Sequence, residues 1–150
     1  MTECFQFEAD FAASLRCIPM PVRYKLDTCG VKLKLQHWNQ LSVAERQQLL
    51  AQPCASPAER AAYRQQLQTW VVRDTGAPAT EFAVAPQPPW EVTTALPAAV
   101  QAKLQELGQV ITLSQWESLS PLQRFALLKL SRPSHENRNF LPALREFGLL

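Results

Sequence analysis

The sequence lacks the short motifs that mark most nucleotide- and metal-dependent enzymes. It contains no G-x-G-x-x-G, no P-loop, no H-E-x-x-H and no EF-hand loop, and it has only four glycines and two histidines. A chain so poor in glycine has little backbone for cradling phosphates. Neither histidine stands near a serine, cysteine or acid at a spacing typical of a nucleophile system. We therefore expect a protein that is not an enzyme, with no catalytic residues and no cofactor.

Long apolar runs and cysteine motifs are also missing. No apolar run approaches the ~20 residues that a membrane span needs, and the acidic start MTECFQFEADF is unlike a secretory signal. The four cysteines (Cys4, Cys17, Cys29 and Cys54) form no C-x-x-C pair, and a chain of this length needs no disulfide framework. These features predict a cytoplasmic protein with reduced thiols and no membrane association.

Charge of neither sign dominates the chain. A formal net charge of +2 is too small to imply nucleic acid as a partner. Positive charge is concentrated between Arg16 and Arg46, a stretch that contains six Lys or Arg and two Asp or Glu. A nucleic-acid-binding regulator is a hypothesis that depends on this stretch alone, without a convincing recognition helix.

The most informative feature present is an internal repeat. Residues 18–50 align with residues 96–128, and 12 of the 33 positions are identical. In each copy an amphipathic pattern predicts a helix, an L-x-x-W-x-x-L pattern a short second helix, and a serine-led capping box a third. The sequence thus predicts an all-α single-domain helical bundle, built from two tandem copies of a helix–short helix–helix unit with approximate two-fold symmetry.

The repeat also divides the chain. Residues 1–17 are expected to form an N-terminal arm, 18–75 copy one, 76–95 a Pro-rich connection and 96–150 copy two, with the longest helix at about Pro57 to Arg73. The positions that the copies share should be core, because aromatic and aliphatic residues at helical spacing usually pack. These positions are Val22, Leu26, Leu35, Trp38, Leu41 and Leu49, with Val100, Leu104, Leu113, Trp116, Leu119 and Leu127 as their partners.

The cysteines of copy one suggest a second class of function, a small metal or iron–sulfur carrier using Cys17, Cys29 and Cys54. A helix between Cys17 and Cys29 would hold them roughly 15 Å apart, too far for one ion, so we expect no metal site. A bridge between Cys29 and Cys54 is conceivable, although free buried thiols are favoured. Cys17 is the candidate reactive thiol, because it precedes a helix N-terminus and adjoins Arg16.

The two copies differ in the predicted outer face of their first helix. Copy one carries Met20, Arg23, Tyr24 and Asp27 there, whereas copy two carries Ala98, Gln101, Ala102 and Gln105. A structural need common to both copies would appear in both. The difference therefore indicates either a partner protein that contacts only copy one or the N-terminal arm packing over Met20 and Tyr24.

Several stretches of copy one resemble a known family. FEADF, SLRCIPM, VRYKLDTCGVKLKL, ERQQLL and the following Pro53-Cys54 are similar to the nitrate-reductase-associated proteins of cyanobacteria and some algae, strongly over residues 5–70 and loosely beyond. The resemblance implies an accessory protein for ferredoxin-dependent assimilatory nitrate reductase, acting either in cofactor insertion or as a bound subunit. It supplies no catalytic residues.

The leading hypothesis is a non-catalytic protein that binds nitrate reductase or its cofactor-maturation machinery. The candidate contacts are Arg16, Met20, Arg23, Tyr24, Asp27, Lys32 and Lys34.

Overall fold

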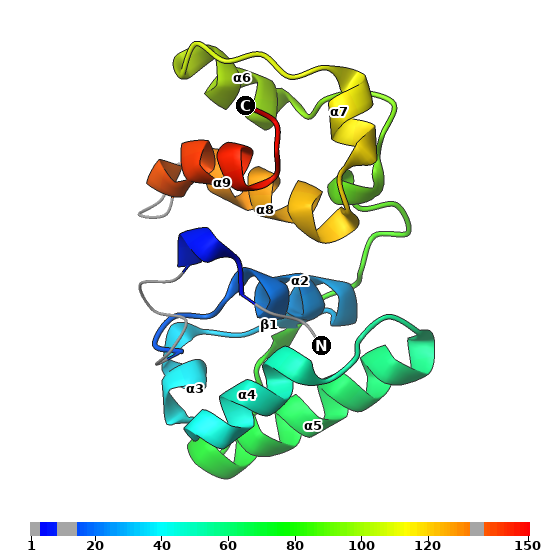
Figure 1. Ribbon diagram of the computed structural model, residues 1–150. Coiled ribbons are helices and arrows are strands. Elements are labelled where there is room, and N and C mark those ends of the chain that lie inside the picture. Colours follow the sequence, from blue (N-terminus) through cyan, green and yellow to red (C-terminus); the bar gives the residue numbers. More distant parts are fainter. Residues whose placement is uncertain (1–3, 9–14, 133–136) are drawn as a thin grey trace. The chain divides into compact units, whose positions relative to one another are not determined.

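The computed structural model of the protein (Figure 1) describes residues 4–8, 15–132 and 137–150. Within these ranges the chain is mostly helical, and its sheet has two short strands. The predicted all-α class is confirmed. No described helix combines the length and the apolar composition required to cross a membrane. Of the predicted N-terminal arm, residues 1–3 and 9–14 lie outside the described residues.

The chain divides into two compact units, residues 1–85 and 86–150. The boundary falls inside the predicted Pro-rich connection 76–95. The first unit contains the 3-10 helix η1 (Gln6–Glu8), α2 (Met20–Cys29), β1 (Val31–Lys32), α3 (Leu35–Gln40), α4 (Val43–Ala51), α5 (Pro57–Thr75) and β2 (Thr80–Glu81). The second contains η2 (Pro89–Glu91), α6 (Ala98–Glu106), α7 (Leu113–Ser118), α8 (Pro121–Ser131), η3 (Asn137–Asn139) and α9 (Phe140–Glu146).

The core of the first unit forms where α2 and α5 pack together. Tyr63, Leu67 and Val71 recur at helical spacing on α5 and are almost fully buried, as are Val22 of α2 and Trp38 of α3. A contiguous apolar cluster thus joins residues from positions 15 to 79 of the chain.

Capping boxes begin the helices where the sequence predicts them. Ser42 accepts a hydrogen bond from the Glu45 amide, and the Glu45 carboxylate accepts one from the Ser42 amide, at 3.1 and 2.9 Å. The same reciprocal bonds begin α5 at Ser56 and α8 at Ser120. Each box satisfies two of the four amides that a helix start leaves without partners.

The small sheet links the end of α2 to the segment after α5. The strands β1 and β2 are antiparallel, with Val31 opposite Glu81, and the sheet fixes part of the segment that the sequence assigns to the connection. Gly30 ends α2 in the left-handed conformation, at φ 79°, and its carbonyl accepts a hydrogen bond from the Phe82 amide at 2.9 Å. The side-chain amide of Gln68 on α5 pairs with both the N–H and the carbonyl of Ala79, each at 2.8 Å. Gln68 therefore holds the residue before β2 against α5.

The second unit has helices at positions that correspond to those of the first. Its helices α6, α7 and α8 begin at residues 98, 113 and 121, and α2, α3 and α4 begin at residues 20, 35 and 43, so all three pairs of starts follow the alignment of the repeat. Helix α8 packs against α6 and α9. The relation of the two segments by a two-fold axis, and their place in a single domain, stay predictions.

An arginine at equivalent positions binds the end of the short helix in each unit. Arg46 donates from Nε to the Trp38 carbonyl at 3.1 Å and from Nη2 to the Asn39 carbonyl at 3.1 Å. Arg124 donates from Nη1 to the carbonyls of Trp116 and of the residue after it, at 3.4 and 3.3 Å. The Trp38 and Trp116 carbonyls also accept from the C-cap amides of Leu41 and Leu119, at 3.1 and 3.2 Å, so each guanidinium adds a second donor at the end of the short helix.

The predicted core is mostly confirmed, with one pair of errors. Trp38 and Trp116 are both fully buried, and each indole N–H donates to a backbone carbonyl, of Leu15 at 2.7 Å and of Val92 at 3.0 Å. Leu35 and Leu113 were expected in the core but are 52% and 40% exposed. Each is the first residue of its short helix, and a helix this short buries only one narrow face, which Trp38 and Trp116 occupy.

Glu8 of η1 caps α2 from a distance. The N-cap position of α2 is Pro19, whose side chain cannot accept a hydrogen bond. The Glu8 carboxylate, only 3% exposed, accepts instead from the Met20 amide at 2.8 Å and from the Phe5 amide at 3.3 Å. Described residues of the predicted arm therefore complete the N-terminus of α2.

Replacing Glu8 by alanine should lower the free energy of unfolding by about 1 to 3 kcal/mol, because it leaves the buried Met20 amide without an acceptor. Glu8→Gln keeps an amide oxygen at the same distance and should cost less. Urea denaturation followed by circular dichroism measures both variants. Equal stability of Glu8→Ala and the unchanged protein would contradict the capping role.

Candidate functional site

Helix α2 and the segment around it carry the candidate partner-binding residues. The helix contributes Val22, Leu26 and Cys29 to the core, as expected, and Met20, Pro21 and Lys25 are buried as well. It ends at Gly30, where the chain turns into β1. The candidate contacts therefore come from one continuous stretch, residues 16–34.

Met20 was expected on the outer face of α2, and this prediction is wrong. Its side chain is only 2% exposed. Met20 is the first residue of α2, and its amide binds the buried Glu8 carboxylate of η1. A described residue of the N-terminal arm thus binds the backbone at the start of α2. Because the Met20 side chain is buried, a partner cannot reach it.

The remaining candidates on α2 are half-buried. Arg23, Tyr24 and Asp27 retain part of their surface. The Arg23 Nε donates to the Ile18 carbonyl at 2.8 Å, so part of its guanidinium supports the segment before the helix. A partner can reach only the outer edges of these three side chains.

The candidates on either side of α2 are exposed. Arg16 precedes the helix, Lys32 lies on β1, and Lys34 occupies the N-cap position of α3. The Lys34 amide donates to Nδ1 of His37 at 3.2 Å. Burial, followed by the nearby charge of Lys34, lowers the pKa of His37. A neutral His37 can accept this bond. The bond uses the backbone of Lys34, whose side chain is exposed.

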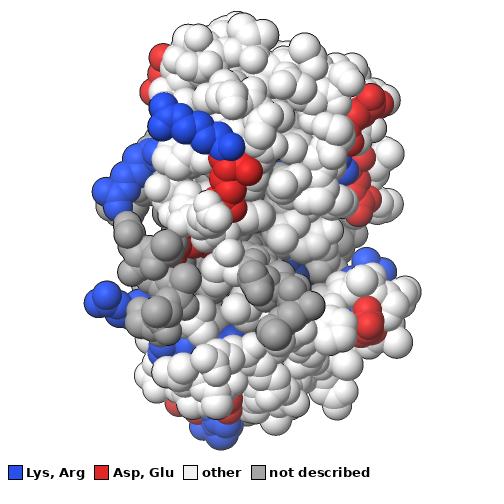
Figure 2. Space-filling model, viewed as in Figure 1, with Lys and Arg blue, Asp and Glu red and all other residues white. Residues whose placement is uncertain are grey.

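Charge on the visible surface is dispersed. On the face drawn in Figure 2, cationic and anionic side chains of the described residues occur in small groups scattered over uncharged surface, and at the upper left a cationic group touches an anionic one. A protein that binds nucleic acid through phosphates usually presents a continuous basic stripe. The described part of this face offers local ionic contacts instead.

The cysteines are arranged differently from the sequence-based hypothesis of a shared ion. Cys17 precedes α2 and Cys29 is its last residue, so the helix separates them by roughly 15 Å. All four cysteines are free, Cys29 and Cys54 being buried and Cys4 and Cys17 half-buried. Among the described residues, no group of three or more His, Cys, Asp or Glu could hold a metal ion.

Cys29 and Cys54 meet at the last turn of α2. The Cys54 thiol donates to the carbonyl of Lys25, and the Cys29 thiol donates to that of the next residue, Leu26, both at 3.6 Å. The Thr28 hydroxyl lies 3.7 Å from the Cys54 sulfur. Once Cys54 is ionised, the Cys29 thiol can donate to its sulfur instead. Two cysteines that are distant in the sequence thus form a pair.

The surroundings shift the pKa values of the two thiols in opposite directions. The hydrogen bond from Cys29, with smaller contributions from Thr28 and the charges of Lys25 and Arg60, lowers the pKa of Cys54 to about 7, against the opposing effect of burial. The same hydrogen bond, followed by burial, raises the pKa of Cys29. When the pair ionises, Cys54 is therefore the thiol that loses its proton first.

A buried lysine accompanies the pair. Lys25 is 7% exposed, and its Nζ donates to the Leu50 carbonyl at 2.6 Å and lies 6.0 Å from the centre of the Tyr63 ring. Burial lowers the pKa of Lys25, while the nearby Cys54 opposes that change. Within the described part of the chain no carboxylate pairs with Lys25, so the Cys54 sulfur is the ionisable partner of its ammonium group.

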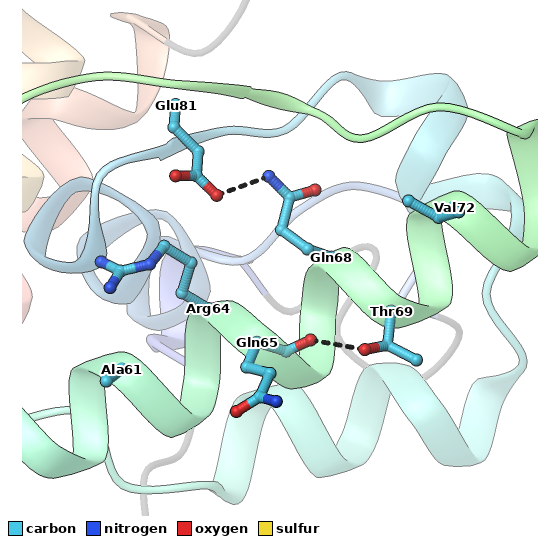
Figure 3. Close-up of a pocket in the computed structure, with 7 residues that line it drawn as sticks. All are labelled: Ala61, Arg64, Gln65, Gln68, Thr69, Val72 and Glu81. Carbon is cyan, nitrogen blue, oxygen red and sulfur yellow. Dashed lines mark hydrogen bonds between the residues drawn. The ribbon is translucent and has the colours of Figure 1, made fainter.

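Helix α5 and β2 border an open groove that the sequence did not predict. Its volume is about 600 Å³, and Figure 3 shows its lining residues, which are Ala61, Arg64, Gln65, Gln68, Thr69, Val72 and Glu81. Gln68 donates to the Glu81 carboxylate at 3.0 Å, and Arg64 donates to the Cys29 carbonyl at 3.1 Å. The groove offers hydrogen-bonding groups, and the hydroxyl of Thr69 donates to the Gln65 carbonyl at 2.8 Å. The polar residues at positions 64, 65, 68 and 69 share one face of α5, and this spacing is the signal from which the groove could have been found.

The fold and the surface define a small helical protein with a cationic, partly exposed segment around its first long helix and a buried thiol pair behind it. The chain belongs to the family described as conserved nitrate reductase-associated protein, whose model matches residues 4–147. The match covers nearly the whole chain and confirms the resemblance seen in the sequence. Comparison with curated proteins and with solved structures found no match. The family is named as associated with nitrate reductase rather than as a reductase.

Proposed function

We propose that the protein is a non-catalytic accessory protein that binds nitrate reductase or its cofactor-maturation machinery in the cytoplasm. Membership of the nitrate reductase-associated family is the observation that carries this proposal. It is supported by the groups available in the described residues, which provide ionic contacts and a polar groove.

The binding surface that we propose consists of Arg16, Lys32 and Lys34, with the outer edges of Arg23, Tyr24 and Asp27. At the aligned positions of the second copy, the three exposed cations are replaced by Thr94, Val110 and Thr112. Positions that only maintain the helix–short helix–helix unit would tend to keep their character in both copies. We infer that the first copy binds the partner and that the second serves as scaffold.

The chemistry of this surface favours a partner with an acidic patch. Cations exposed at the rim of an interface accelerate association and select the partner, and a like charge placed opposite an acidic patch costs several kcal/mol. Nucleic acid and membranes are not partners in this proposal.

Changing Lys32 and Lys34 to glutamate should reduce association with nitrate reductase at least about 10-fold, because it reverses two exposed charges. The measurement is copurification of the tagged protein from cells that reduce nitrate, with partners identified by mass spectrometry, beside nitrate-reducing activity in complemented cells. Arg23 is left unchanged because its bond to Ile18 would confuse binding with folding.

The matched control is Arg132→Glu with Arg145→Glu, which makes the same change of net charge at exposed positions of the second unit. This control should keep association and activity, since exposed substitutions usually alter stability by less than about 0.5 kcal/mol. Full association of a folded Lys32/Lys34 variant would refute the proposed surface. Failure of nitrate reductase or its maturation proteins to copurify with the unchanged protein would refute the proposed function. The cofactor content of the copurified enzyme distinguishes a chaperone from a bound subunit.

A further inference from the structure

The pairing of Cys29 with Cys54 has no counterpart in the second unit. The aligned positions there are Leu107 and Arg132. The lysine itself is shared, since Lys25 corresponds to Lys103, which forms a salt bridge with Glu106 at 3.3 Å. A lysine buried at the same place in both copies thus has a carboxylate near it in one and a thiol in the other.

Cys54 lies near positively charged side chains and is more exposed than Cys29. Lys25 and Arg60 provide positive charge near its sulfur. The residue is 8% exposed, whereas Cys29 is 2% exposed. Cys54 is therefore the more accessible sulfur of the pair, and the two sulfurs lie at adjacent carbonyls of α2, those of Lys25 and Leu26, each at 3.6 Å.

We propose that Cys54 is a modification site for hydroperoxides and that Cys29 converts the oxidised product into an intramolecular Cys29–Cys54 disulfide. In the first step the Cys54 thiolate attacks the terminal oxygen of the hydroperoxide. The O–O bond breaks, and Cys54 becomes a sulfenic acid while the leaving alkoxide or hydroxide takes up a proton. In the second step the Cys29 sulfur attacks the sulfenic sulfur. The S–O bond breaks, and the hydroxyl leaves as water with the proton of Cys29.

The balance of this reaction is one disulfide formed for each hydroperoxide reduced. The two thiols lose two electrons and two protons, and hydrogen peroxide yields two molecules of water. The disulfide would join the last residue of α2 to the connection between α4 and α5. Closing a loop of this size restricts the unfolded chain, so the oxidised protein should melt a few degrees higher than the reduced one.

The test uses the full chain with Cys4→Ser and Cys17→Ser, which leaves only the pair. Exposure to hydrogen peroxide at neutral pH should remove both thiols, lower the mass by two hydrogen atoms and give a peptide linked through Cys29 and Cys54. Dithiothreitol should restore both thiols. Further replacement of Cys29 by serine should stop the reaction at a sulfenic acid on Cys54, which dimedone traps.

The effect of Lys25 on the reactivity of Cys54 provides an independent test. The rate of Cys54 alkylation by iodoacetamide, followed against pH, should have its midpoint near the pKa of about 7. Lys25→Gln should move that midpoint upward, because it removes a positive charge beside the thiolate. A Lys25→Gln variant that does not fold leaves the peroxide test unaffected. Both thiols surviving peroxide, or a sulfenic acid on Cys29 while Cys54 stays reduced, would overturn the proposal.

Discussion

Replacing Arg124 by methionine is expected to lower the free energy of unfolding by about 3 to 5 kcal/mol. Arg124 is 6% exposed and donates from Nε to the Trp90 carbonyl at 2.6 Å and from Nη1 to the carbonyls of Trp116, Glu117 and Leu119. Methionine fills a similar volume but has no donor, so the buried carbonyls of Trp90 and Leu119 would lose the bonds from Arg124, while the Trp116 carbonyl keeps the Leu119 amide. Urea denaturation measured by circular dichroism and tryptophan fluorescence gives the loss directly.

Arg46→Met is the matched control. Arg46 occupies the equivalent position and makes the same bonds to the end of the short helix, but it is half-buried. Water can replace part of its guanidinium, so its loss should cost about 1 to 2 kcal/mol. If Arg124→Met is no more costly than Arg46→Met, the role assigned to burial at Arg124 is wrong.

Replacing Gly30 by alanine should lower the free energy of unfolding by about 3 kcal/mol, from two effects that add. The left-handed backbone that Gly30 adopts, at φ 79°, costs alanine about 1 to 2 kcal/mol. A Cβ placed there would also lie 2.5 Å from the Phe82 carbonyl oxygen, a backbone atom. The strand segment must therefore move, and the bond from the Phe82 amide to Gly30 weakens or breaks.

Gly108→Ala separates these two effects. Gly108 is the aligned glycine of the second copy, with φ 66°, and a Cβ there would have no heavy atom within 4 Å. Its replacement should cost only the backbone strain, about 1 to 2 kcal/mol. Thermal and urea denaturation of both variants measure the difference. Equal losses would mean that the contact with Phe82 relaxes without cost.

The elements of the fold that depend on local chemistry could be predicted from the sequence. Ser42, Ser56 and Ser120 begin helices because their hydroxyl groups cap the third amide, and this needs only residues three positions apart. Trp38 and Trp116 are buried as predicted, because a tryptophan at helical spacing has a large apolar surface to remove from water. Leu35 and Leu113 show the limit, since hydrophobic spacing does not reveal how little of such a short helix is covered.

The candidate site could be predicted only where its residues are neighbours in the chain. Arg16, Lys32 and Lys34 are exposed, as a binding role requires. Met20 is buried, and its amide binds Glu8 of the separate helix η1; helical periodicity predicts neither fact, because it describes only the spacing of residues along one helix. Cys29 and Cys54 are distant in the sequence. From the sequence alone, a bridge between them was one alternative, but their proximity could not be established. The sequence instead indicated Cys17 as the reactive thiol, because Cys17 precedes a helix N-terminus and adjoins Arg16.

The core of the first unit has a consequence for the order of events during synthesis. Among the described residues, the buried members of its apolar cluster lie between positions 15 and 79, and Cys4 packs against them. Contacts that close over short stretches of chain form quickly, because little loop entropy must be lost first. We expect this cluster to assemble while the later residues are still being translated, so that the α2 surface exists before the chain is complete.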